Sequence, residues 1–143
     1  MKTNREIAEI FEDIGFLLEV KGDNPFKIRS YKKAASLIKS LLKPLSEIRE
    51  KGELKKLEGV GEAISKKIEE ILDTGDCNLR RRLIDEFSPE FLILRKVKGI
   101  GPQTAKKIYE TFGTKDFLSA DEEELRKILS KKQFENLKGF LNE

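Results

Sequence analysis

Two pairs of lysines follow two Gly-x-Gly turns at the same spacing, a pattern suited to binding phosphate. Gly59-Val60-Gly61 precedes Lys66-Lys67, and Gly99-Ile100-Gly101 precedes Lys106-Lys107 at the same offset. Two glycines around one apolar residue make a tight turn, and the helix that follows offers free N–H groups to an anion. The alternative is that the glycines serve only a turn between helices. The candidate phosphate-binding residues of this repeat are Gly59, Gly61, Lys66, Gly99, Gly101, Lys106 and Lys107.

Lys67 is the candidate nucleophile. It falls within the helically spaced apolar series that begins at Ile64 and ends at Ile71, whereas Lys66 points away from that series. A lysine partly withdrawn from water loses its proton more readily, and the neutral amine attacks an aldehyde to form a Schiff base. The alternative is that the stem packs on the core while the ammonium faces a phosphate, as the equivalent position of Lys107 also suggests.

Main-chain carbonyls around each turn are candidate ligands for a cation. Oxygen-only ligation suits a hard ion, so we expect Na⁺ or K⁺ to bridge each hairpin to a phosphate. The candidate carbonyl ligands belong to Lys55, Leu57, Val60, Arg95, Val97 and Ile100.

A basic run precedes the first turn. From Lys27 to Lys43 there are six basic residues and no acidic one. We interpret this run as one face of a helix that contacts nucleic acid, although such a run can also be a solvated face. Phe26 begins this helix and is either a core residue, the interpretation we favour, or a platform on which an exposed base stacks.

Composition narrows the chemistry. The chain has no histidine and the single cysteine Cys77, which excludes an intrachain disulfide and removes the commonest general base and metal ligand. The net charge of +3, from 29 basic and 26 acidic residues, is too small to indicate nucleic acid by itself. No apolar run reaches membrane length and the N-terminus does not resemble a signal peptide, so we expect a cytoplasmic protein without membrane contact.

The elements that position these residues are predicted to be helices throughout, because strand alternation is absent from the sequence. Thr3 and Glu6 form a capping-box pattern, and Asn24-Pro25 is a typical helix start. Ser130 and Gln133 repeat the capping-box pattern near the C-terminus. The expected helical segments cover about residues 3–21, 25–42, 46–51, 62–73, 77–87 and 102–112. Two more segments are expected in the tail, one that begins after a cap at Ser119 or Asp121 and ends near residue 129, and one from about residue 130 to residue 141.

The same patterns predict which side chains are buried. On the first helix, Glu9, Glu12 and Asp13 are expected to point outward. The buried stripe of the second helix is expected to contain Tyr31, Ala34, Ala35, Ile38 and Leu42. We predict an all-α fold of two small helical subdomains, residues 1–76 and residues 77–143, each with one hairpin.

The order of these motifs resembles the amino-terminal part of the X-family (polymerase-beta-like) DNA polymerases, in their bacterial and archaeal branch. Both turns resemble the helix-hairpin-helix motif, which grips nucleic-acid backbones without reading sequence. The resemblance covers nearly the whole chain. Its matching stretches are Tyr31–Ser36, Lys55–Gly61, Thr74-Gly75, Val97–Pro102 and Asn24–Lys27.

The resemblance implies a DNA-repair function. In that family the first part is a lyase domain that removes 5′-deoxyribose phosphate through a lysine Schiff base and needs no cofactor, and the second part grips the duplex. By position, Lys67 corresponds to the Schiff-base lysine, and Lys27 corresponds to the lysine at the 5′ phosphate. Tyr31 corresponds to the tyrosine that accompanies that phosphate-binding lysine, and a further family lysine falls on Lys55. Glu70 or a water is the candidate proton acceptor for the elimination.

The sequence also departs from the family pattern. Family lysines are replaced by Ala63 and Leu79, a glutamate by Lys66 and a histidine by Phe26. The metal-binding palm of these polymerases is absent, so we expect no polymerisation by this chain alone. We expect binding of gapped, nicked or damaged DNA, as in base excision repair, beside a polymerase palm domain or repair proteins. The alternatives are a non-catalytic DNA-binding module of, or a fragment from, an X-family DNA polymerase, and a protein-interaction domain.

Overall fold

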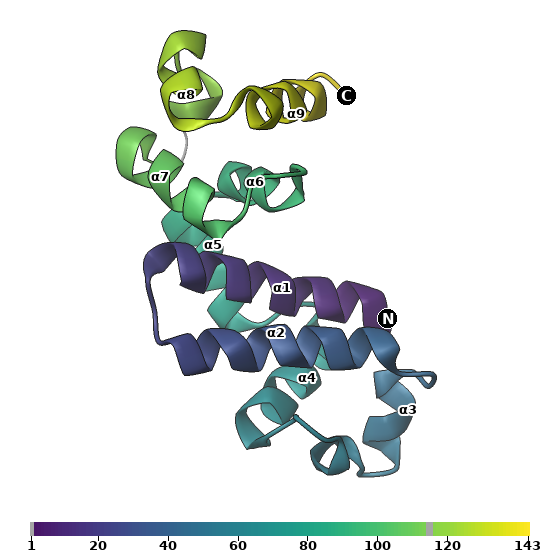
Figure 1. Cartoon of the computed structure of the whole chain (residues 1–143). Helices are drawn as coiled ribbons and strands as arrows, with labels where there is room; N and C mark the ends of the chain where they lie inside the picture. Colours follow the sequence, from purple (N-terminus) through teal and green to yellow (C-terminus); the bar gives the residue numbers. More distant parts are fainter. Residues whose placement is uncertain (1, 114–115) are drawn as a thin grey trace. The chain divides into compact units, whose positions relative to one another are not determined.

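A computed structural model of the chain describes residues 2–113 and 116–143, and every regular element in these ranges is helical (Figure 1). The all-α prediction is therefore confirmed for the described residues. The α-helices are α1 (Asn4–Lys21), α2 (Pro25–Ser40), α3 (Leu45–Glu50), α4 (Glu62–Thr74), α5 (Asn78–Phe87), α6 (Ile93–Lys96), α7 (Pro102–Phe112), α8 (Glu122–Ile128) and α9 (Lys131–Leu141). Short 3₁₀ turns are η1 (Leu54–Lys56), η2 (Pro89–Leu92) and η3 (Asp116–Leu118).

The chain divides into two compact units. The first contains residues 1–15 and 23–82, and the second contains residues 16–22 and 83–143, so that α1 supplies residues to both. Each unit contains one Gly-x-Gly turn. The predicted boundary between residues 76 and 77 stays a prediction.

The first unit is built from most of α1, from α2 to α4 and from the first half of α5, and its helices begin close to where the sequence predicts. Thr3 and Glu6 form the capping box, with N–H to side-chain oxygen distances of 2.9 and 3.2 Å. The Asn24 side chain accepts a hydrogen bond from the Phe26 N–H at 2.8 Å. Because these caps satisfy N–H groups that lack a partner inside the helix, they fix where α1 and α2 start. The core residues of this unit include Ile7, Phe11, Ile14, Tyr31, Ile38, Ile64 and Ile68.

The burial predictions for Leu42 and Asp13 are wrong. Leu42 is fully exposed (100%), because α2 ends at Ser40 and the residue lies beyond the buried stripe of that helix. Asp13 is buried (7% exposed) rather than outward-facing, and its Oδ2 lies 2.9 Å from Nε of Arg80. The ion pair offsets the cost of burying this carboxylate.

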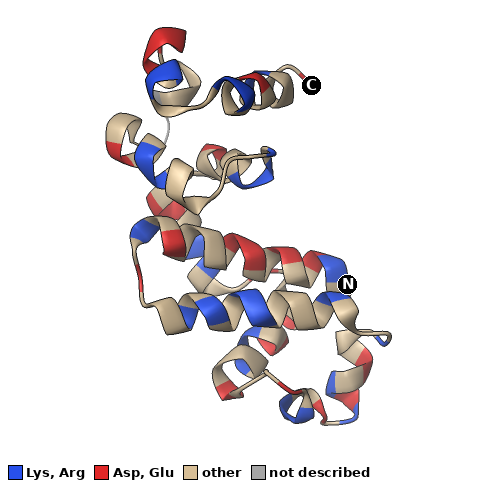
Figure 2. Ribbon diagram, viewed as in Figure 1, with Lys and Arg blue, Asp and Glu red and all other residues tan. Residues whose placement is uncertain are grey.

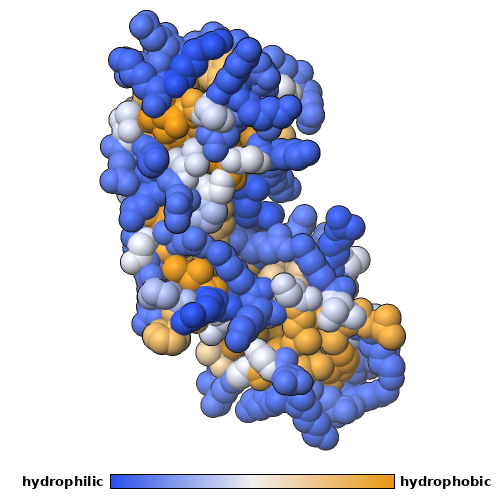
Figure 3. All heavy atoms as spheres, in the orientation of Figure 1, coloured by the Kyte–Doolittle hydropathy of each residue, from blue (hydrophilic) through white to orange (hydrophobic). Residues whose placement is uncertain are grey.

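Aromatic side chains form the core of the second unit. Phe91 lies between Phe87 and Phe117, with ring centroids at 5.5 and 6.2 Å, and Tyr109 of α7 packs 5.1 Å from Phe87. The predicted capping box of Ser130 and Gln133 starts α9. This core holds α7, and with it the second Gly-x-Gly turn. Hydrophilic side chains cover most of the face seen in Figure 3, with smaller hydrophobic areas between them.

Candidate nucleic-acid interface

The two Gly-x-Gly turns have the same backbone. Gly59 and Gly99 have φ of 86° and 87°, a left-handed conformation that favours glycine. Gly61 and Gly101 are extended residues at the N-caps of α4 and α7, with φ of −86° and −99°. The repeat seen in the sequence is therefore a repeat of conformation, in which a tight turn delivers the chain into the start of a helix.

Both helix starts are open to a ligand. Neither Gly61 nor Gly101 has a side chain to cap the first N–H groups of its helix. A Cβ atom built on either glycine, or on Gly59, would meet nothing within 4 Å. Uncapped N–H groups and the positive end of the helix dipole favour an anion. The arrangement suits a phosphate that approaches close to the backbone.

The main-chain carbonyls at each turn keep acceptor capacity for a cation. Leu57 O accepts the Val60 N–H at 3.1 Å, and Val97 O accepts the Ile100 N–H at 3.2 Å. A carbonyl oxygen has two lone pairs, so each retains one for a further partner. The donor set fits a hard monovalent ion, and the ion itself stays a proposal. Within residues 2–113 and 116–143, no cluster of His, Cys, Asp or Glu could hold a metal.

The surroundings of Lys67 differ from those of the other lysines that follow the two turns. The Lys67 side chain is half-buried, and its Nζ lies 5.9 Å from the centroid of the buried Tyr31 ring. Lys66 is exposed and pairs with Glu62 at 3.7 Å, and Lys106 and Lys107 are also exposed. Helical spacing alone could not make this distinction, because Lys67 and Lys107 hold the same position in their repeats. The predicted catalytic pair, Lys67 and Tyr31, does lie together.

Tyr31 is held as a neutral phenol. Its side chain is 4% exposed and its ring stacks on Phe11 with centroids 6.0 Å apart. Burial, with smaller contributions from Cys77 and Asp23, raises the pKa of Tyr31 to about 12. At neutral pH the hydroxyl therefore keeps its proton, and Tyr31 can act beside Lys67 as a positioning or hydrogen-bonding group rather than as a base.

This pKa predicts how stability depends on pH. Between its ordinary pKa of 10.0 and about 12, Tyr31 is ionised in the unfolded chain but protonated in the folded one, so stability falls as pH rises through this window. Over this window, we expect the free energy of unfolding of Tyr31→Phe to fall by about 2 kcal/mol less than that of the wild type. Urea unfolding of both proteins near pH 9 and near pH 12 measures the two losses. Equal losses in both proteins would contradict the assignment.

The start of α2 presents an exposed cationic and aromatic surface. Phe26 is 72% exposed, so the favoured interpretation of it as a core residue is wrong, because its position on the first turn of α2 faces away from the buried stripe. The Arg29 guanidinium lies 4.7 Å from the centroid of the Phe26 ring. Lys27 is exposed beside them, and Figure 2 shows α2 with basic but no acidic residues along it. Lys55, on η1, is also exposed.

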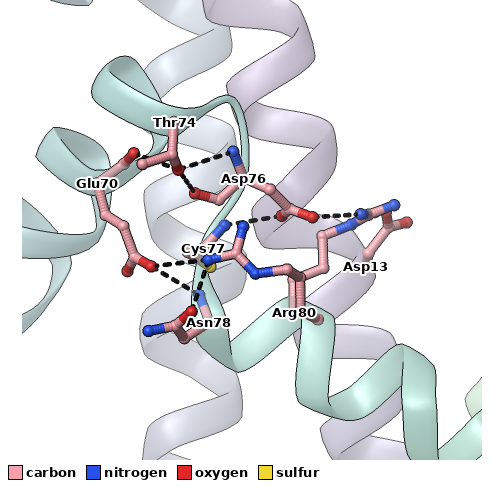
Figure 4. A network of polar contacts seen from close by, with 8 residues as sticks. Asp13, Glu70, Thr74, Asp76, Cys77, Asn78 and Arg80 are labelled. Atoms are coloured by element: carbon pink, nitrogen blue, oxygen red, sulfur yellow. Dashed lines mark hydrogen bonds and ion pairs between the residues drawn. The ribbon is translucent and has the colours of Figure 1, made fainter.

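A polar network fixes the corner between α4 and α5 (Figure 4). Glu70 accepts hydrogen bonds from the Asn78 N–H at 2.8 Å and from Arg81 at 3.3 Å, so it caps α5 and is already engaged. Arg80 binds both Asp13 and Asp76, at 2.9 and 3.0 Å. Burial alone would lower the pKa of Arg80, but the hydrogen bond and charge of Asp13 raise it.

Sequence reasoning missed this network. The i,i+4 spacing of Asp76 and Arg80 could have predicted the ion pair between these two residues. The partner on α1 is far away in the sequence and leaves no such signal.

Comparisons with known proteins agree with these observations. A model of the helix-hairpin-helix domain family matches residues 2–77, and a model described as a SAM-like helix-hairpin-helix tandem matches residues 91–143. The chain is 29% identical over 136 residues to the DNA polymerase/3′-5′ exonuclease PolX of Bacillus subtilis (strain 168). That alignment covers 95% of this chain and 22% of the relative, so the chain spans about a fifth of the relative's length. In the described ranges, no helix is both long and apolar enough to cross a membrane.

Proposed function

Because the chain belongs to the helix-hairpin-helix domain family, we propose that it binds the backbone of gapped, nicked or damaged DNA without reading its sequence. The observation that carries this proposal is the pair of matching turns, each leading into a helix whose first N–H groups are open. Lys66, Lys106 and Lys107 are exposed on the helices behind the turns and would add charge to the phosphate contacts. A monovalent cation on the turn carbonyls would bridge to the same phosphates.

Salt dependence tests this function. Each phosphate neutralised contributes about 0.9 to the slope of log affinity against log salt concentration, so two hairpins with about two phosphates each predict a slope of roughly −4. Fluorescence anisotropy with a nicked duplex, repeated on a second duplex of scrambled sequence, measures both the slope and the sequence preference. A slope near zero, or strong preference for one sequence, would contradict the proposal.

The exposed side chain of Phe26 supports a preference of the protein for gapped over nicked DNA. An exposed aromatic ring that is followed by Lys27 and contacted by the Arg29 guanidinium suits stacking of an unpaired base. In the same titration, Phe26→Ala should lose roughly tenfold in affinity for a one-nucleotide gap and little for a nick, because stacking is worth ~1–3 kcal/mol per base. An equal loss on both substrates would rule out a base-stacking role for Phe26.

The second part of the proposal is 5′-deoxyribose-phosphate lyase chemistry on Lys67. The neutral amine attacks the C1′ aldehyde carbon, and loss of water forms a Schiff base. Removal of a C2′ proton then breaks the C3′–O bond and leaves the phosphate on the DNA, after which hydrolysis of the imine frees the lysine. Because Asn78 and Arg81 already hold Glu70, we assign the proton transfer to water. Lys27 and Lys55 would bind the 5′ phosphate.

A non-catalytic DNA-binding module is the second candidate. A non-catalytic module would make the same phosphate contacts as the lyase but would form no covalent adduct with DNA. Borohydride trapping of such an adduct therefore distinguishes the two functions. Association with a polymerase palm domain or with repair proteins belongs to the same proposal, through the relationship to bacterial PolX.

A further inference from the structure

The two hairpins differ in what lies behind them. In the second unit, Gln133 Nε2 donates a hydrogen bond to Gly99 O at 2.8 Å, and Asn136 Nδ2 donates one to Lys98 O at 2.9 Å. Both side chains belong to α9. In the part of the chain that the structure describes, no side chain hydrogen-bonds the corresponding carbonyls of Glu58 and Gly59. A Cβ atom on Gly99 would lie 3.7 Å from Asn136 and 3.8 Å from Gln133, whereas one on Gly59 meets nothing.

Gln133 is itself held in place. Its Oε1 accepts the Ser130 N–H at 2.9 Å, and its own N–H donates to Ser130 Oγ at 3.1 Å. Its Nε2 also lies 3.5 Å from Oγ1 of Thr104 on α7. The capping box that starts α9 therefore also directs the amide group of Gln133 onto the second turn and the helix behind it.

The start of α9 is built differently from the starts of α4 and α7. The tandem family match over residues 91–143 includes both helix pairs, but the turn between α8 and α9 has Leu129 and Ser130 in place of Gly-x-Gly. Ser130 Oγ already occupies the Gln133 N–H, whereas Gly61 and Gly101 leave the equivalent groups uncapped. At the start of α9, the Gln133 N–H already has a partner in the Ser130 side chain, which also covers it. This helix start is therefore poorly suited to an approaching phosphate.

We propose that α9 is a brace for the second hairpin and not a further phosphate-binding helix, with Gln133 and Asn136 as positioning residues. This inference rests on the proposed function only in taking the DNA backbone as the ligand. The braced second hairpin binds DNA in the conformation it already has. The first hairpin has no such support and adapts to the backbone on which it closes.

Amide hydrogen exchange in the free protein tests the brace without DNA. The Ile100 and Val60 N–H groups make equivalent turn hydrogen bonds, at 3.2 and 3.1 Å. We expect Ile100 to exchange more slowly than Val60, and Gln133→Met/Asn136→Leu to speed Ile100 exchange about tenfold and leave Val60 unchanged. Ser130→Ala, which removes the cap oxygen but keeps both amide groups, is the control and should change Ile100 much less. Unchanged Ile100 exchange in the double variant would overturn the brace, and Asn136→Leu alone serves if the double variant unfolds.

DNA titrations complete the test. The double variant should lose roughly three- to tenfold in affinity for a nicked duplex with an unchanged salt slope, because its phosphate contacts are the same once formed. Lys131→Ala/Lys132→Ala, at the exposed start of α9, should leave the slope unchanged. A slope smaller by about one or more in that variant would show that α9 binds phosphate itself and would overturn the proposal. If the wild type bound no DNA, the proposed function would fail, but the exchange comparison would still decide the brace.

Discussion

Replacing Lys67 by alanine should abolish the covalent adduct between this protein and DNA that carries a 5′-deoxyribose phosphate at a nick. Borohydride reduces a Schiff base to a stable amine, so the adduct reports the nucleophile directly. We expect at least about 100-fold less adduct from Lys67→Ala than from the wild type, because Lys67 is half-buried beside the Tyr31 ring, whereas the other lysines of the two repeats are exposed. Denaturing gel electrophoresis of the labelled DNA measures the yield.

Lys107→Ala is the matched control, since Lys107 holds the same position in the second repeat but is exposed. Lys66→Ala tests the neighbouring amine. Both variants should retain most of the adduct, with any loss explained by weaker DNA binding in a parallel titration. An undiminished adduct from Lys67→Ala would contradict the assignment. A wild type that binds DNA but forms no adduct would establish the non-catalytic module instead.

The surroundings of Lys67 show where sequence reasoning ends. Spacing places both Lys67 and Lys107 on apolar stripes, and it predicts the same chemistry for each. The difference arises from tertiary structure, because Tyr31 of α2 lies beneath Lys67 with its ring centroid 5.9 Å from Nζ. A helix period describes one face of one helix and contains no information on which helix packs against it.

The same limit explains the burial errors. The caps of α1, α2 and α9 depend on residues two or three apart in the sequence, and all were predictable. The helical pattern predicts an outward-facing Asp13, and it carries no sign of the partner Arg80, which is 67 residues away. A large apolar residue such as Phe26 is usually buried, but its place at the start of α2 leaves it 72% exposed.

The hairpins were predictable for the opposite reason. Positive φ at Gly59 and Gly99 and the extended N-caps at Gly61 and Gly101 follow from local chain geometry, which Gly-x-Gly before a helix specifies. The difference between the two turns was not predictable, since it depends on Gln133 and Asn136 more than thirty positions along the chain. The conformation of the two turns is therefore set by the local sequence. The hydrogen bonds that support the second turn come from tertiary structure.

Substituting valine for both Gly61 and Gly101 should reduce affinity for nicked DNA by roughly 100-fold. A branched side chain at each helix start would keep the phosphate from the N–H groups, and a loss of ~1.4 kcal/mol at each hairpin corresponds to tenfold. These positions separate binding from folding. Both glycines have negative φ, and a Cβ atom there would meet nothing within 4 Å. We therefore expect a stability cost of only about 1 kcal/mol per site, from the poor N-cap preference of valine.

Gly59→Val and Gly99→Val would be less informative, because a branched residue is strained at φ of 86° or 87°. A loss of affinity in these variants could then come from a loss of structure. Gly139→Ala, on the open surface of α9, is the control for glycine replacement and should leave affinity unchanged. Each single valine variant should lose about tenfold if the hairpins act independently. Full affinity in the double variant, with its fold intact by circular dichroism, would mean that the two turns are only corners between helices.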